Sequence, residues 1–257
     1  MRPGFESILT AFIVATFGFA DDANAACNGA SGRAHPNGGG FVADTAHAHA
    51  TVYIGSNAML CANTRAQQQA RIEDSAVVQE SAIVYGSAVI SGNAVVEGNA
   101  RVMESGTVTD RARIAGSGEV FGNAVIADHA QIIESGRAYA DARVYERATI
   151  SGTANVGLNV QVYGDAQVLG ASFITEQARI YGRAKVSTAQ YVAGSAHVFG
   201  NAVVSGNTKI YGNAHICGSA VISGDGWVGG HDWVGCTDSE PDGDNLPEEN
   251  VISTDAN

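Results

Sequence analysis

The sequence of 257 residues is poor in proline, in aromatic residues and in positive charge. Its four prolines are Pro3, Pro36, Pro241 and Pro247, so the stretch from 37 to 240 contains none. Lys and Arg number 14 against 26 Asp and Glu, which gives a net charge of −12. This balance argues against a nucleic acid partner, whose phosphates need basic side chains, and against electrostatic docking on an anionic membrane.

Long hydrophobic runs are also missing. The apolar run Ile8–Ala20 covers 13 residues, short of the roughly 20 that a membrane-spanning helix needs. Arg2 is the only basic residue before it, and residues 23–25 form a small-x-small cleavage site. We therefore predict a signal peptide over 1–25, removal of which leaves no transmembrane span. An uncleaved anchor or a buried segment is the alternative interpretation.

What the sequence does contain is a repeat of six residues. Counted in steps of six from Val42 to Val234, 29 of 33 lead positions are Val or Ile. The fourth residue after each lead is Ala or Gly at 25 of 32 positions, and the corner between them is often Gly followed by Asn, Ser or Asp. No insertion or deletion breaks the phase. An internal repeat of this kind indicates a solenoid.

The pattern has a direct physical interpretation. The small residue and the lead point inward and their neighbours outward, which is the alternation of a β-strand. Val and Ile suit a pleated surface, and Gly and Asn tolerate the backbone angles of a tight corner. Each unit is therefore one short strand and one corner. A unit cannot bury its inner face alone, so the units must stack.

Six-residue units of this type resemble the hexapeptide-repeat proteins with a left-handed parallel β-helix. The resemblance covers about residues 42–235. It implies an all-β, single-stranded, triangular left-handed parallel β-helix with 18 residues per coil and about 11 coils, and the proteins it points to are commonly trimers. A right-handed solenoid is the alternative. We predict a solenoid over 42–236, an N-terminal arm or cap over 26–41, and an acidic disordered tail over 237–257.

Outward aromatic residues support the coil of 18 independently. Residues that follow the leads fall into two columns at this spacing. One column is Tyr145, Tyr163, Tyr181 and Phe199, and the other is Tyr85, Met103, Phe121 and Tyr139. Their aromatic members are candidate binding or interface residues. Three interpretations stay open: shielding of the sheet, contact between protomers of a trimer, and binding of a glycan or another envelope partner.

The four cysteines fit the same coil. Cys217 and Cys236 follow their leads one coil apart on the same face, at the separation that a disulfide needs. We therefore predict the disulfide Cys217–Cys236, and Cys27–Cys61 by elimination. The second bond would tie the N-terminal arm to an early coil.

Enzymes of the resembled family build sites in clefts between neighbouring prisms, usually with loops that leave the coils and with a histidine base or three zinc-binding histidines. This repeat has no loop insertions. His197 and His215 are 18 apart and precede their leads, so they are weak catalytic candidates that should stack with Trp233 following. His47 and His49 share one face and could bind a metal ion weakly, but no three histidines have the spacing of the family's zinc sites. Thr107 and Thr109 do not extend into the threonine array that ice binding requires.

These observations favour a non-catalytic exported solenoid, secreted or periplasmic, that serves as a structural or binding element at the cell envelope. We predict neither a cofactor nor a metal ion. The alternative is an acyltransferase-like enzyme with its site between protomers of a trimer.

Overall fold

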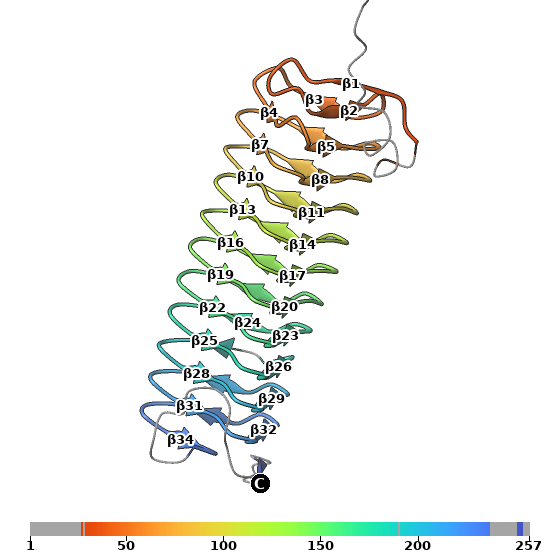
Figure 1. Cartoon of the computed structure of the whole chain (residues 1–257). Helices are drawn as coiled ribbons and strands as arrows, with labels where there is room; N and C mark the ends of the chain where they lie inside the picture. The colour runs from red at the N-terminus through yellow and green to blue at the C-terminus, as the bar shows by residue number, and fades with distance from the viewer. Residues whose placement is uncertain (1–26, 28, 190, 237–250, 254–257) are drawn as a thin grey trace, which may run out of the picture.

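The computed structural model describes residues 27, 29–189, 191–236 and 251–253. It is an all-β solenoid of about 11 coils whose short strands stack into three long parallel sheets (Figure 1). The predicted signal peptide lies outside the described residues, as does most of the predicted tail. No described helix is long and apolar enough to cross a membrane.

Sheet 1 is the longest of the three. Its strand β1 runs antiparallel to β2, whereas every other pair in it is parallel. At the other end β35, which lies within the expected tail, pairs with β32. In sheet order the strands are β1 (Gly32–Ala34), β2 (Phe41–Ala43), β5 (Met59–Leu60), β8 (Val77–Val78), β11 (Val95–Val96), β14 (Arg113–Ile114), β17 (Gln131–Ile132), β20 (Thr149–Ile150), β23 (Gln167–Leu169), β26 (Lys185–Ser187), β29 (Val203–Ser205), β32 (Val221–Ser223) and β35 (Val251–Ser253).

Sheet 2 follows sheet 1 along each coil. Its strands are β3 (His47–Ala48), β6 (Arg65–Ala66), β9 (Ile83–Val84), β12 (Arg101–Val102), β15 (Glu119–Val120), β18 (Arg137–Ala138), β21 (Asn155–Val156), β24 (Phe173–Ile174), β27 (Tyr191–Val192), β30 (Lys209–Ile210) and β33 (Trp227–Val228).

Sheet 3 completes each coil. Its strands are β4 (Tyr53–Ile54), β7 (Arg71–Ile72), β10 (Val89–Ile90), β13 (Thr107–Val108), β16 (Val125–Ile126), β19 (Arg143–Val144), β22 (Gln161–Val162), β25 (Arg179–Ile180), β28 (His197–Val198), β31 (His215–Ile216) and β34 (Trp233–Val234).

The register confirms a coil of 18 residues. Ile90 pairs with Val108, for example, and Val108 pairs with Ile126. Neighbouring rungs of a sheet are therefore about 4.8 Å apart, the usual separation of paired strands. A side chain that points outward consequently meets the outward side chain 18 residues later, so columns of surface residues run along the solenoid.

The core is formed by the leads and the small residues. Val, Ile and Ala from all three sheets are fully buried in one continuous cluster along the axis. The residue two places after nearly every lead turns the corner with a positive φ, as at Gly92 with φ 65°. A Cβ on Gly92 would come within 2.7 Å of the backbone nitrogen of Asp110 on the next coil. The corner therefore favours glycine for both conformation and space.

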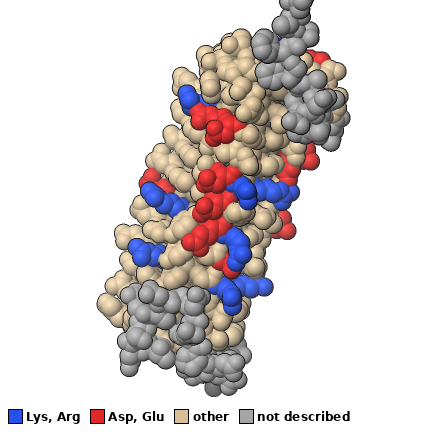
Figure 2. Space-filling view, viewed as in Figure 1, with Lys and Arg blue, Asp and Glu red and all other residues tan. Residues whose placement is uncertain are grey.

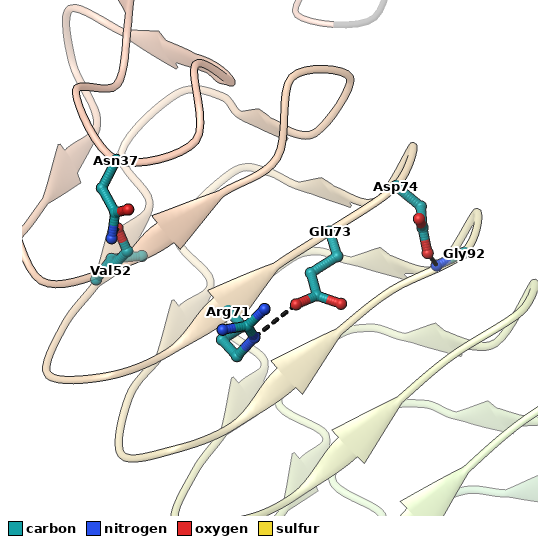
Figure 3. A network of polar contacts seen from close by, with 6 residues as sticks. All are labelled: Asn37, Val52, Arg71, Glu73, Asp74 and Gly92. Carbon is teal, nitrogen blue, oxygen red and sulfur yellow. Dashed lines mark hydrogen bonds and ion pairs between the residues drawn. The ribbon is translucent and has the colours of Figure 1, made fainter.

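The N-terminal arm covers one end of this core. The N–H of Gly40 donates to the carbonyl of Ile54, whose N–H in turn donates to Asn37 O. The Asn37 side-chain amide also donates to Val52 O at 3.0 Å (Figure 3). Val42 and Val52 are buried as a result. The segment expected to be an arm or cap thus lies against the first coil.

Both predicted disulfides are present. Cys27 is bonded to Cys61, with Cα atoms 5.3 Å apart, and joins the N-terminal segment to the second rung of sheet 1. Cys217 is bonded to Cys236, with Cα atoms 5.1 Å apart, and closes the last coil. The two ends of the solenoid are therefore each held by a covalent bond.

Candidate binding surfaces

The first aromatic column lies on sheet 3, where it follows strands β19, β22, β25 and β28. Successive ring centroids are 4.9, 4.9 and 4.8 Å apart from Tyr145 through Tyr163 and Tyr181 to Phe199, and successive planes differ by 1° to 4°. Two parallel rings with centroids this close must lie face to face with partial overlap, because two coplanar rings at the same distance would clash. Each inner ring therefore presents its faces to its neighbours, and Phe199 is only 1% exposed.

Burial also changes the acidity of this column. Loss of solvent raises the pKa of Tyr163 above its ordinary value. The pKa of Tyr145 is raised as well, mainly by burial and further by the proximity of Tyr163 and Glu146. The phenols of Tyr145 and Tyr163 thus remain neutral to higher pH than a solvated tyrosine does.

The histidine pair adjoins this column on sheet 3. His197 and His215 have ring centroids 4.8 Å apart, and Trp233 stacks on His215 at 3.9 Å with planes 4° apart. The rings of Tyr181 and Phe199 meet the histidines edge-on, at 6.0 and 6.4 Å. The structure thus brings the two catalytic candidates together, packed within aromatic neighbours. Among the described residues no three His, Cys, Asp or Glu side chains are grouped to hold a metal ion.

The second aromatic column lies on sheet 2 and is longer than the sequence analysis indicated. Phe121 and Tyr139 stack with centroids 5.4 Å apart, and Tyr85 lies two rungs earlier in the same column. Further along the sheet most of the aromatic residues lie at the positions before the leads. This continuation consists of Phe173, Tyr191, Tyr211 and Trp227. We call these four residues the sheet 2 aromatic strip.

Sequence reasoning missed this strip because it sought aromatic columns on this face only at the position after each lead, where Tyr211 is the one member of the strip. Phe173, Tyr191 and Trp227 precede their leads, and Tyr211 follows its lead. The four residues occupy consecutive rungs of sheet 2, from β24 to just after β30 and on to β33. Comparison of both outward columns of one face, rather than one column at a time, would have revealed them.

Two glycines lie directly beneath tyrosine rings on sheet 2. A Cβ on Gly229 would come within 2.4 Å of two atoms of the Tyr211 ring, and a Cβ on Gly157 within 2.0 Å of the Tyr139 ring. Three atoms of each ring lie at similar distances from the Cβ position. The glycine is therefore opposite the face of the ring and not its edge. Because a Cβ stands roughly perpendicular to a sheet, each ring lies flat on the sheet surface.

Two hollows occur near the N-terminal end. The larger, of about 450 Å³, is open to solvent and is lined by His47, His49, Gln67 and Gln68. The His49 ring is held by Thr51 Oγ1, 2.8 Å from its Nδ1. A smaller hollow of about 300 Å³ lies over the pair Arg71 and Glu73, whose Nε and Oε1 are 2.5 Å apart (Figure 3).

Many acidic side chains lie at the corners, whereas most described Lys and Arg residues lie in the strands. Acidic residues form a row along the visible face of the prism, with basic residues beside them (Figure 2). Arg147 bonds both carboxylate oxygens of Asp165 at 2.6 Å, which lowers the pKa of that carboxyl. Asp74 instead accepts a hydrogen bond from the backbone N–H of Gly92 at 2.9 Å (Figure 3). The carboxylates of Asp165 and Asp74 thus each hold a contact between neighbouring coils.

Neither a protein-family model nor a curated protein sequence matches this chain.

Proposed function

We propose that the protein is an exported, non-catalytic solenoid that acts outside the cytoplasm as a rigid structural and binding element, secreted or in the periplasm. The observation that carries this proposal is the pair of disulfides at the two ends of an uninterrupted solenoid. Disulfides persist in oxidising compartments and are rare in the cytosol. The predicted signal peptide over 1–25 supports the same location.

The geometry supports binding through side faces. The polar side chains of sheets 1 to 3 form columns rather than a converging set, and both hollows lie open on the surface. Outward aromatic residues follow sheets 2 and 3 over several rungs. Extended columns favour ligands or partners that are themselves extended. We further propose that the coils are left-handed and of the hexapeptide-repeat type, which the repeat unit resembles, and that the prisms associate as trimers.

Cell fractionation with alkylation of free thiols tests the proposal. We expect the protein outside the cytoplasm, without residues 1–25 and with all four cysteines protected from alkylation until a reductant is added. A matched variant without residues 1–25 should stay in the cytoplasm with its thiols free. Recovery of the natural chain from the cytoplasm with intact N-terminus and reduced cysteines would overturn the proposal.

A further inference from the structure

The most exposed apolar side chains of the described residues are concentrated around one face. Trp227 is 66% exposed, Tyr211 41% and Phe173 37%, all on sheet 2. Leu158 is on the corner that follows the same sheet, and only Trp233 lies on another sheet. Exposed apolar residues that cluster on one face, rather than scatter singly, mark a binding surface.

The ring faces of this strip are available in a way that those on sheet 3 are not. Tyr211 lies flat over Gly229 and turns its second face outward. Trp227 lies beside it, with centroids 5.9 Å apart and planes 30° apart. By contrast, each inner ring of the sheet 3 column has neighbours on both faces. In the sheet 2 strip, Tyr211 and Trp227 therefore offer two neighbouring ring faces to an approaching ligand.

The strip follows sheet 2 along the prism, with Tyr211 in the outward column beside that of the other three residues. Its four rings occupy four consecutive rungs, a length of about 14 Å at the usual strand separation. Phe173 stacks on Tyr191 and Tyr211 contacts Trp227, so two ring pairs follow one another along the prism. The Tyr191 hydroxyl lies 3.4 Å from Glu176 Oε1, which positions the ring. The matching ligand is flat, apolar on its face and extended along the strip.

Lys209 is the one cation among these rings. In the register of sheet 2 it lies between Tyr191 and Trp227. Its ammonium can donate hydrogen bonds to hydroxyl groups at the edge of a ligand. Glu176 and the net charge of −12 disfavour an anionic polymer. The charges therefore suit a ligand that is neutral and rich in hydroxyl groups.

Other occupants fit less well. A stable protein interface, including one with a second copy, uses roughly 20–30 residues on each side, far more than this strip provides. Two copies would each carry a net charge of −12, so their association would also be opposed by electrostatic repulsion. A lipid surface would require side chains that project into it, whereas Tyr211 lies flat on Gly229.

We propose that the strip formed by Phe173, Tyr191, Tyr211 and Trp227 binds a neutral, extended polysaccharide. The apolar C–H face of a sugar ring would lie on the outward faces of Tyr211 and Trp227, because the negative face of an aromatic ring attracts such hydrogens. Lys209 would donate to ring hydroxyls. This inference rests on the proposed function, since it names the ligand of an exported binding element.

Binding of the oxidised protein to neutral glycans tests the inference. We expect retention on insoluble cellulose or chitin and calorimetric binding of cellohexaose or chitohexaose. Trp227→Ala and Tyr211→Ala should each weaken binding about tenfold. Trp233→Ala is the matched control, because it removes an exposed tryptophan from sheet 3, and it should bind as the natural protein does.

A second variant keeps every aromatic side chain. Gly229→Ala places a Cβ where the Tyr211 ring lies, so the ring must lift from the sheet and binding should weaken. Gly157→Ala displaces Tyr139 in the same manner outside the strip and should leave binding unchanged. Equal binding by all variants, no glycan binding by the natural protein, or binding to phosphatidylcholine vesicles instead of glycans would overturn the inference. An exported, oxidised protein that binds no glycan would refute only this inference, whereas a reduced cytoplasmic protein would refute the proposed function.

Discussion

Thirteen described residues other than glycine have a positive φ, all at corners of the coils. Eight of them are Asp or Glu, and six of these accept a hydrogen bond from the backbone N–H of the residue 18 positions later. Asp128, for example, accepts from Glu146 N at 2.9 Å. The carboxylate thus satisfies a backbone donor of the next coil, which offsets the cost of the left-handed conformation. Part of the negative charge of the chain is therefore structural.

Leu158 occupies such a corner without a carboxylate. Its φ is 57° and its side chain is 43% exposed. We expect Leu158→Gly to raise the free energy of unfolding by about 1 kcal/mol, because glycine adopts this conformation without the steric cost. Urea denaturation measures the change. Leu158→Ala is the control, since it keeps the Cβ and should recover little of this stability; an equal gain in both variants would show that the apolar side chain, not the backbone, is responsible.

At the scale of one sheet, the sheet 3 column links neighbouring rungs through its rings. Folding raises the pKa of Tyr145 and Tyr163, mainly by burial. The folded state therefore holds the phenol proton more tightly than the unfolded state. The contribution of these groups to stability is complete below the ordinary tyrosine pKa of about 10 and is lost as pH rises through the folded pKa.

This sign predicts an alkaline loss of stability. Urea denaturation from about pH 9 to about pH 11 should show a falling free energy of unfolding, with late ionisation of tyrosine by ultraviolet absorbance. The double variant Tyr145→Phe and Tyr163→Phe should lose less stability over this range, because phenylalanine keeps the stack but does not ionise. A decline of the same size in the double variant would refute the explanation.

At the scale of the whole molecule, the prism has three faces with different surfaces. Sheet 2 carries exposed rings, and sheet 3 carries rings that cover one another. The N-terminal arm covers the first coil, and a disulfide closes the last one. We expect the proposed trimer to form through a side face rather than through the covered first coil.

Solution scattering of the natural protein beside Tyr163→Ser tests the sheet 3 column as such a face. Because its rings stack within one chain, we expect the variant to lose stability on urea denaturation and to keep the particle mass of the natural protein. Trp227→Ala, on sheet 2, is the matched comparison and should keep both. A trimer that dissociates on Tyr163→Ser would instead identify the column as the contact between protomers.

The sequence by itself determined the coil. A one-residue shift would turn every lead Val and Ile from the core to solvent, so an unbroken period of six specifies the register. The spacing of 18 between aromatic residues, and between the leads that precede the final two cysteines, then set the coil length, and the disulfides Cys27–Cys61 and Cys217–Cys236 followed. The register, the coil length and the disulfides all depend on which side chains point inward, and the local sequence pattern reveals this.

Only the tertiary structure decided what the surface offers. The repeat places no constraint on outward residues. The aromatic residues of sheet 2 occupy two neighbouring outward columns, one before and one after the leads, and neither column alone shows that they form one surface. The ring of Tyr211 over Gly229 and the carboxylate of Asp128 on Glu146 N depend on contacts between coils. Near residue 189 the chain also departs from the repeat, because Ala189 is buried one position before the expected small residue. Contacts between rungs, rather than the pattern within one rung, therefore define the candidate binding surface.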